Sequence, residues 1–161
     1  MTELPGWLKH ATVWGLLAAG IFVGVQAWQR QQAATRVVAE GGVVELRRGA
    51  DGHYHWPGTV DGRPVDFLVD TGATRSALPA RLAREFGLPI VGTQTSSTAG
   101  GVVQATVVRG DLALRGGLRV QALRLAALPD LQSPLLGMDV LGRLRWQQDG
   151  GVLRVDLGGV R

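Results

Sequence analysis

The residues best suited to chemistry are Asp70-Thr71-Gly72, which directly follow the apolar run Phe67-Leu68-Val69. A carboxylate at the end of a strand can take a proton from water, and the glycine lets another backbone approach it closely. Without a metal, thiol or serine nucleophile, a water can be activated between two such carboxylates, which share one proton because they cannot both ionise comfortably at close range. The alternative is a turn acid that only ends a strand, since Asp and Gly are common turn residues.

Cysteine is absent, which excludes disulfides, thiol catalysis and cysteine-based zinc sites. His53 and His55 lie two apart on a predicted strand and therefore share a face, as two metal ligands would. No further His or Cys follows them to complete a coordination shell. We therefore expect a packed or solvated histidine pair, no metal site and no cofactor.

The net charge of +4 is spread along the chain. Residues 1–39 carry three basic and one acidic side chain, and residues 40–161 carry 14 arginines and 12 acids, so each part contributes +2. A nucleic-acid-binding protein would concentrate positive charge on one stripe or helix face. The scattered arginines therefore predict no nucleic-acid partner, and a composition of 45% hydrophobic and 19% charged residues indicates a globular chain.

The N-terminal segment carries no charged side chain between Lys9 and Arg30. Trp7 and Trp28 bracket this segment, about 31 Å apart if it is helical, which is close to the hydrocarbon thickness of a bilayer. Tryptophan favours membrane interfaces. The pattern predicts a transmembrane anchor over residues 1–29.

Within this anchor, residues 11–28 would contact the lipid bilayer. Two alternatives remain open, a signal peptide cleaved near Val25-Gln26-Ala27 and a soluble hydrophobic helix. Positive charges on the two sides nearly balance, so the charge pattern leaves the topology open. Residues 30–42 are interpreted as a tether, and residues 43–161 as the globular domain.

The globular part reads as short strands joined by turns, typical of an all-β barrel or sandwich. Asp61-Gly62 and Asp149-Gly150-Gly151 are hairpin-turn signals. The expected strands are Val43–Arg47, His53–Val60, Arg63–Val69, Val102–Arg109, Leu118–Leu128, Arg143–Gln148 and Val152–Asp156.

Two short helices are expected in this domain. The first begins after Pro79, carries Leu82 and Phe86 four residues apart on one face, and ends at Gly87. Arg81, Arg84 and Glu85 would form its solvated face. The second follows Gly137 around Met138–Leu144, with Asp139 expected to cap its N-terminus. Trp56 and Trp146 are expected to pack in the core or at a sheet edge.

With these residues in order, the chain resembles the retropepsin-like (clan AA) aspartic proteases, and more narrowly their bacterial, membrane-anchored, single-lobe type. The resemblance covers about residues 43–157. Residues 65–74 are similar to the family's catalytic strand and turn, and Leu135-Leu136-Gly137-Met138 resembles its second signature. Residues 96–102 lie where the family carries its flap, a hairpin that closes over substrate; the candidate flap residues are Thr98, Ala99, Gly100, Gly101 and Val102.

The resemblance implies a retropepsin-like barrel, preceded by a single transmembrane helix, in which Asp70 is the catalytic aspartate. It also implies that Thr71 bonds across to a partner's turn, Gly72 allows close approach, and Ala73 leaves room for substrate. Leu135, Leu136 and Gly137 would pack beneath the catalytic turn. Because the chain holds one Asp-Thr-Gly, the second aspartate must come from another copy in a C2 homodimer.

By the same resemblance, the chain is an aspartic endopeptidase of the bacterial inner membrane, with one membrane pass and its catalytic domain in the periplasm. Its substrates would be extended segments of membrane or periplasmic proteins. The alternative is a non-catalytic membrane-anchored module of the same fold that binds peptides or dimerises. The intact Asp70-Thr71-Gly72 favours the enzyme.

Overall fold

The computed structural model describes residues 14–25, 37–98 and 101–158. The chain divides into two compact units, Met1–Thr35 and Arg36–Arg161. In the first unit residues 14–25 are helical, and no helix in the described ranges is both long enough and apolar enough to cross a bilayer. The remainder of the predicted anchor, and the tether up to residue 36, lie outside the described residues.

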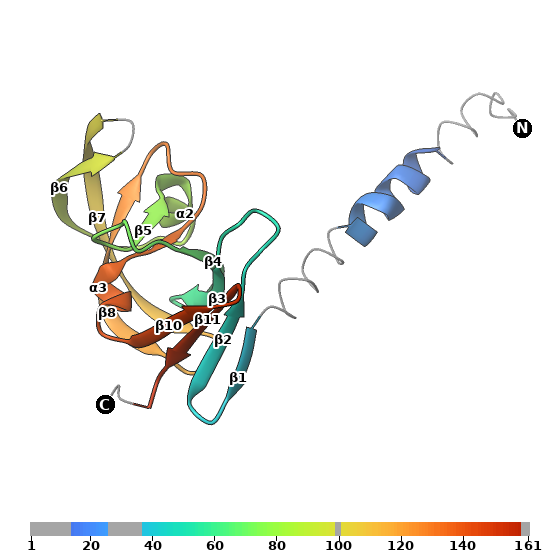
Figure 1. The fold of residues 1–161 in the computed structure, drawn as a ribbon. Helices are drawn as coiled ribbons and strands as arrows, with labels where there is room; N and C mark the ends of the chain where they lie inside the picture. The colour runs from blue at the N-terminus through green and yellow to red at the C-terminus, as the bar shows by residue number, and fades with distance from the viewer. Residues whose placement is uncertain (1–13, 26–36, 99–100, 159–161) are drawn as a thin grey trace, which may run out of the picture. The chain divides into compact units, whose positions relative to one another are not determined.

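The second unit is mostly β and contains two sheets (Figure 1). The larger sheet has the strand order β3-β4-β9-β5-β8-β7-β6, and an additional β3–β7 pairing closes its first six strands into a barrel. The smaller sheet has the order β1-β2-β11-β10. The strands are β1 (Val37–Glu40), β2 (Val43–Arg47), β3 (His55–Val60), β4 (Arg63–Val69), β5 (Ala77–Pro79), β6 (Ile90–Thr98), β7 (Gly101–Leu114), β8 (Arg119–Leu128), β9 (Leu135–Leu136), β10 (Arg145–Asp149) and β11 (Val152–Asp156).

Both predicted hairpin turns are confirmed. Asp61 and Gly62 have positive φ angles of 48° and 77° between β3 and β4, as a two-residue turn of the primed type requires. Gly150 and Gly151 turn β10 into β11 in the same way, at 53° and 80°. The sequence pattern predicted a barrel or a sandwich, and the β3–β7 pairing makes the fold a barrel, as the resemblance implies.

The two predicted helices also form. Helix α2 (Ala80–Glu85) begins after Pro79, and Gly87 follows it at φ 67°. The side chains expected on its solvated face, Arg81, Arg84 and Glu85, are exposed. Helix α3 (Met138–Leu141) is shorter than the range expected for it, because Gly142 ends it.

Four strands, β1, β5, β6 and β9, lie outside the ranges expected from the sequence, and the first and third are the longest of them. Val37–Glu40, in the stretch predicted as a tether, forms β1 and pairs antiparallel with β2 through the turn Gly41-Gly42, at φ 59° and 81°. Ile90–Thr98 forms β6, paired along β7. The second half of β6 consists of polar Thr, Gln and Ser residues and lacks the apolar alternation that reveals a strand.

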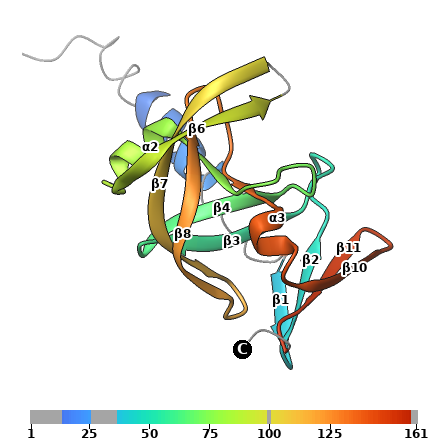
Figure 2. The same ribbon diagram turned by 90° about the vertical axis from the view of Figure 1, so that its left-hand side faces the viewer.

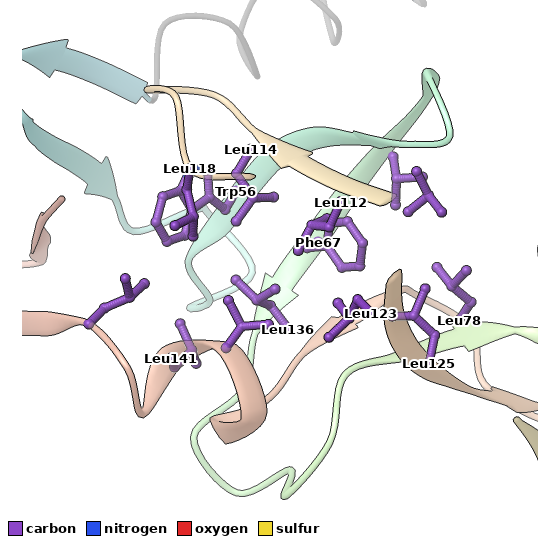
Figure 3. Close-up of a cluster of buried hydrophobic side chains, with 14 of the residues drawn as sticks. Trp56, Phe67, Leu78, Leu112, Leu114, Leu118, Leu123, Leu125, Leu136 and Leu141 are labelled. Atoms are coloured by element: carbon purple, nitrogen blue, oxygen red, sulfur yellow. The ribbon is translucent and has the colours of Figure 1, made fainter. Parts of the chain in front are cut away.

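The core lies inside the barrel and extends to the smaller sheet (Figure 3). Trp56 and Phe67 are fully buried there, and burying each large side chain contributes about 1.5–3 kcal/mol. The indole Nε1 of Trp56 donates a hydrogen bond of 2.8 Å to the Arg115 carbonyl, so its polar atom is satisfied. The β6–β7 hairpin and the smaller sheet lie at opposite ends of the unit (Figure 2).

Candidate active site

Strand β4 places Asp70 at the end of a partly buried parallel strand pair. Leu68 and Val69 of β4 lie beside Leu135 and Leu136 of β9. The pairing continues one residue past β4, because the Asp70 amide donates to the Leu136 carbonyl at 3.0 Å. The position of the aspartate backbone is therefore set by the second signature, far along the chain.

The turn after β4 fixes the Asp70 carboxylate. The Gly72 amide donates to Asp70 Oδ1 at 2.9 Å, and the Ala73 amide donates to the Asp70 carbonyl at 3.3 Å. A Cβ on Gly72 would stand 3.2 Å from the same Oδ1, a tight contact that glycine avoids. Asp70 is half-buried while Thr71 and Gly72 are exposed, so the carboxylate is held at the surface rather than sealed in the core.

A buried serine connects this turn to helix α3. Ser76 is fully buried, and its amide and hydroxyl both donate to Asp139 Oδ1, at 2.9 and 2.8 Å. Its hydroxyl oxygen in turn accepts the Gly137 amide at 3.0 Å. The expectation that Asp139 caps α3 is wrong: the N-cap is Gly137, without a side-chain hydrogen bond, and the Asp139 carboxylate binds the catalytic turn instead.

Gly137 lies directly against the turn. A Cβ there would come within 2.5 Å of the Arg75 carbonyl carbon and 2.8 Å of the Ala73 carbonyl oxygen, so no side chain fits without moving the backbone. The next two amides donate to the turn as well, Met138 to the Ala73 carbonyl at 2.8 Å and Asp139 to the Thr74 carbonyl at 3.2 Å. We call residues 73–76 and 137–139, with these bonds, the turn brace.

Sequence reasoning placed Leu135–Gly137 near the catalytic turn but missed Ser76. A serine three residues after a turn gives no signal by its type. Ser76 is distinguished by its burial, and its hydroxyl is bonded to Asp139, which lies 63 residues further along the chain.

Thr71 lines a cavity of about 150 Å³ with Tyr54 and Trp146 among its walls. Trp146 lies on β10, an edge strand on which all five residues are exposed, and is itself 40% exposed, as expected for packing at a sheet edge. The buried Tyr54 hydroxyl has no hydrogen-bond partner among the residues that the structure describes. The exposed Thr71 therefore lies beside β10, the edge strand of the smaller sheet in the described part of the chain.

The candidate flap residues lie at the end of the β6–β7 hairpin. Thr98 pairs with Gly101, and Ser97 pairs with Val102. Ala99 and Gly100, at the predicted tip, lie outside the described residues. The hairpin exists where the resemblance places it.

Of the two histidines expected on one strand, only His55 lies in β3, where its ring contacts two acids, while His53 precedes the strand and is exposed. His55 Nε2 lies 2.7 Å from Asp51 Oδ2, and His55 Nδ1 lies 3.2 Å from Asp66 Oδ2. The hydrogen bond from His55 holds the pKa of the Asp51 carboxyl below its ordinary value. Within the described ranges, no group of three or more His, Asp or Glu side chains is arranged to hold a metal ion.

The domain is a closed barrel with one Asp-Thr-Gly turn, which is braced by an apolar-apolar-glycine segment and a short helix. These features define the single-lobe retropepsin-like class. Residues 56–143 match the family described as "gag-polyprotein putative aspartyl protease", and the chain belongs to that family. The chain is also 34% identical over 110 residues to a curated Sinorhizobium sp. protein named for its position in the cobV 5′ region. This match covers 65% of the chain and 47% of the relative, so the chain spans about half the length of that relative.

Solved structures support the same class. A retropepsin-like aspartic protease from Rickettsia conorii superposes with a TM-score of 0.60 at 26% identity, covering 73% of this chain and 93% of the other. The EIAV protease complexed with the inhibitor HBY-793 superposes with a TM-score of 0.51 at 18% identity, covering 58% and 89%. The second likeness concerns the fold alone. The chain is thus of retropepsin-like fold and aspartyl protease family.

Proposed function

We propose that the protein is an aspartic endopeptidase that works as a homodimer. The observation that carries the proposal is the Asp70 carboxylate, held at an exposed turn by the Gly72 amide and braced from behind by α3. The chain offers one such carboxylate, and water activation between aspartates requires two. A second copy supplies the other Asp70 across a two-fold axis.

In the proposed mechanism the two Asp70 carboxyl groups share one proton. The ionised group takes a proton from a water molecule, whose oxygen attacks the scissile carbonyl carbon. The protonated group donates a hydrogen bond to the carbonyl oxygen and stabilises the charge that develops there. The pair then holds two protons, and one of them passes to the amide nitrogen. The C–N bond breaks to give a carboxylic acid and an amine, and the pair keeps one proton, as at the start.

The side of the domain that carries Thr71 is suited to the dimer contact. Thr71 is exposed, and the β10 edge beside it presents unpaired backbone groups and the half-exposed indole of Trp146. Such an edge is ready to pair with another chain. Around a two-fold axis, Thr71 of each copy would bond to the turn of the other and hold the two aspartates at a fixed separation.

The substrate would be an extended polypeptide lying between the catalytic turn and the flap residues Thr98–Val102. A strand-like substrate can bond its backbone to both surfaces, as peptides do when they add to a sheet edge. Ala73, half-buried beside the carboxylate, leaves space for the substrate backbone.

We propose that the enzyme is tethered to the bacterial inner membrane with its catalytic domain in the periplasm. The charge-free segment between Lys9 and Arg30, bracketed by Trp7 and Trp28, supports the anchor, and residues 11–28 would contact lipid. Alkaline phosphatase fused after Arg161 would be active if the domain is exported, while a β-galactosidase fusion would not. The opposite pattern contradicts the periplasmic placement.

The proposed chemistry is tested on the full-length chain in neutral detergent. Cleavage of an unstructured protein is followed by mass spectrometry between about pH 4 and 7, for wild type, Asp70→Asn and the matched control Asp61→Asn. Asp70→Asn is expected to lower the rate at least about 100-fold, as loss of a general acid–base group does. The control should cleave within about two-fold of wild type, because Asn tolerates the left-handed conformation of that turn. Cleavage that survives Asp70→Asn contradicts the mechanism; peptide binding without cleavage by a folded wild-type dimer favours the non-catalytic module.

Shared catalysis is tested by mixing. If each site needs two Asp70 residues, equal amounts of exchanged wild type and Asp70→Asn should give about a quarter of the wild-type activity, since about a quarter of the dimers are intact. If one chain sufficed, the mixture would retain about half. The two outcomes separate a dimeric site from a monomeric one.

A further inference from the structure

A second cavity, of about 470 Å³, lies just beyond the turn brace. Its walls come from the end of the catalytic turn, from β8 and from the region of α3. The lining residues are Thr74, Arg75, Val120, Gln121, Ala122, Leu123, Arg124, Asp139 and Arg143. Asp70 is not among them, so this cavity is separate from the carboxylate site.

The cavity is cationic. Three arginines line it, Arg75, Arg124 and Arg143, against one carboxylate, Asp139, whose Oδ1 already accepts two hydrogen bonds from Ser76. None of these three guanidinium groups forms an ion pair within the described part of the chain. Arg124 also stands directly opposite Arg109 of β7, and like charges paired across strands are unfavourable. The lining therefore carries three guanidinium groups against one carboxylate, an excess of positive charge.

One wall of the cavity is formed by a β-bulge in β8. The β7–β8 register shifts between Gly110 and Leu112, and Ala122 takes a φ of 50°, unusual for a residue with a side chain. The Ala122 amide donates to Asp111 Oδ1 at 2.7 Å, which holds the bulge in place. Bulges re-aim side chains next to functional sites, and this one separates the walls formed by Val120–Ala122 and by Arg124.

The cavity is continuous with the candidate active site through the backbone. Thr74 and Arg75 follow the catalytic turn directly, and the Asp139 amide bonds to the Thr74 carbonyl at 3.2 Å. Arg75 lines the cavity and follows Asp70 by five residues in the chain. An extended polypeptide bound along this turn would therefore meet the cavity a few residues from its scissile bond.

We propose that this cavity binds an acidic side chain of the polypeptide substrate and selects substrates that carry Asp or Glu a few residues from the cleaved bond. Guanidinium groups pair with carboxylates through two parallel hydrogen bonds, which makes arginine the residue suited to this recognition. A glutamate side chain fits within the cavity volume, and its charge offsets the excess of positive charge. The proposal deepens the endopeptidase function and rests on it for the identity of the ligand.

Binding is measured first, so that it does not depend on cleavage. Full-length Asp70→Asn protein in neutral detergent is titrated against fluorescein-labelled hexaglutamate and hexaglutamine. Hexaglutamate is expected to bind at least about ten-fold more tightly. Adding Arg75→Gln and Arg143→Gln should remove that preference, whereas the charge-matched control Arg81→Gln with Arg84→Gln, on the exposed face of α2, should retain it.

Equal binding of the two peptides overturns the proposal, and so does a preference lost equally in both double variants. Competition by free glutamate as strong as that by hexaglutamate indicates a small-anion site and also overturns it. Circular dichroism of each variant checks that the fold persists. If the Arg75→Gln/Arg143→Gln variant unfolds, the single variant Arg124→Gln replaces it. The proposal then stands only if the parent protein prefers hexaglutamate and Arg124→Gln has lost that preference.

Cleavage profiling separates this proposal from the function it rests on. Wild type and an Arg124→Gln/Arg143→Gln variant, whose changes line the cavity but lie outside the turn brace, are given a proteome-derived peptide mixture, and the cleavage sites are compared. We expect Asp and Glu to be enriched at one position in wild-type sites and the enrichment to disappear in the variant while cleavage continues. Asp70-dependent cleavage without enrichment overturns the pocket and keeps the protease; pocket-dependent hexaglutamate binding without any cleavage keeps the pocket and overturns the protease.

Discussion

Two aspartate turns follow consecutive strands of the barrel and differ in what surrounds them. Asp61 lies between antiparallel β3 and β4; its carboxylate accepts the Asp111 amide at 2.7 Å, and its own amide donates to the Asp111 carbonyl at 3.0 Å. Asp70 follows β4 into a parallel pairing with β9, and its carboxylate accepts only the adjacent Gly72 amide among the described residues. One carboxylate is used to join two strands, while the other is held at the surface.

The difference shows how residues of the same type acquire different roles. Both turns combine Asp with Gly, and local sequence makes either one a plausible strand end. The Asp61 turn is completed by a two-residue hairpin and one neighbouring strand. The Asp70 turn is held by hydrogen bonds that join Ser76 to Gly137 and Asp139. Its geometry therefore depends on residues 61 and 63 positions away from Ser76 in the chain. Changes to the brace should therefore affect activity and stability together, and changes at Asp61 should affect stability alone.

The largest effect is expected from Gly137→Val. Its Cβ would overlap the Arg75 and Ala73 backbone, and overpacking of this kind costs about 3 kcal/mol or more when backbone must move. Urea denaturation should show the loss of stability, and cleavage should be abolished in the remaining folded protein. Gly62→Val, placed in the open at the other turn, is the control: it strains the backbone but meets no atom within 4 Å. Equal losses of stability and activity in Gly137→Val and Gly62→Val would contradict the difference between the two turns.

A smaller effect is expected from Ser76→Ala. It leaves the buried Gly137 amide without its acceptor and removes one donor from Asp139, which costs about 1–3 kcal/mol. Because the brace orients the catalytic turn, kcat should fall several-fold while KM changes little. Ser76→Thr, which keeps the hydroxyl, should recover part of kcat. A loss of stability with kcat unchanged would show that the brace is structural only.

Asp61→Ala should cost about 1–2 kcal/mol. It removes a hydrogen bond to the Asp111 amide and places an alanine at φ 48°. Asparagine tolerates the left-handed conformation, so Asp61→Asn should lose less stability than Asp61→Ala. In both variants the specific activity of the folded fraction should match wild type, measured at a temperature well below unfolding. Reduced specific activity would mean that the two turns are coupled.

The smallest effect is expected at a third acidic turn residue, Asp51, which is half-exposed beside His55. Because the folded state lowers the pKa of Asp51, the carboxyl stabilises the fold above its unfolded value of about 4, and that stabilisation is lost as pH falls through the lowered value. Asp51→Asn should therefore cost no more than about 0.5 kcal/mol at pH 6, and the difference should vanish near pH 2. Urea titrations at both pH values check this.

Local signals predicted most of the fold. The hairpins at Asp61-Gly62 and Gly150-Gly151 and helix α2 follow from turn residues, Pro79 and Gly87, whose backbone preferences act over a few residues. Strand β6 escaped prediction because its pairing with β7, and not its own pattern, makes it a strand. Strand β9, two residues long, exists only through its neighbours β4 and β5.

The candidate site divides in the same way. Asp70-Thr71-Gly72 could be recognised because the motif is contiguous. The Ser76–Asp139 bond could not, since neither residue type specifies a partner 63 positions away. Asp139 was expected to cap its own helix, a local role, and a long-range partner took its carboxylate instead. The cationic cavity likewise combines arginines from three separate segments.

The distance along the chain between the catalytic turn and its brace also sets the order of events in synthesis. Ser76 finds its partners 61 and 63 residues downstream, and contacts between such distant positions form late because a long loop must close first. When Asp70 leaves the ribosomal exit tunnel, Gly137 and Asp139 have not yet been synthesised. The nascent chain therefore emerges with its aspartate before it has the residues that hold the turn, and the turn can be completed only when nearly the entire domain has been translated.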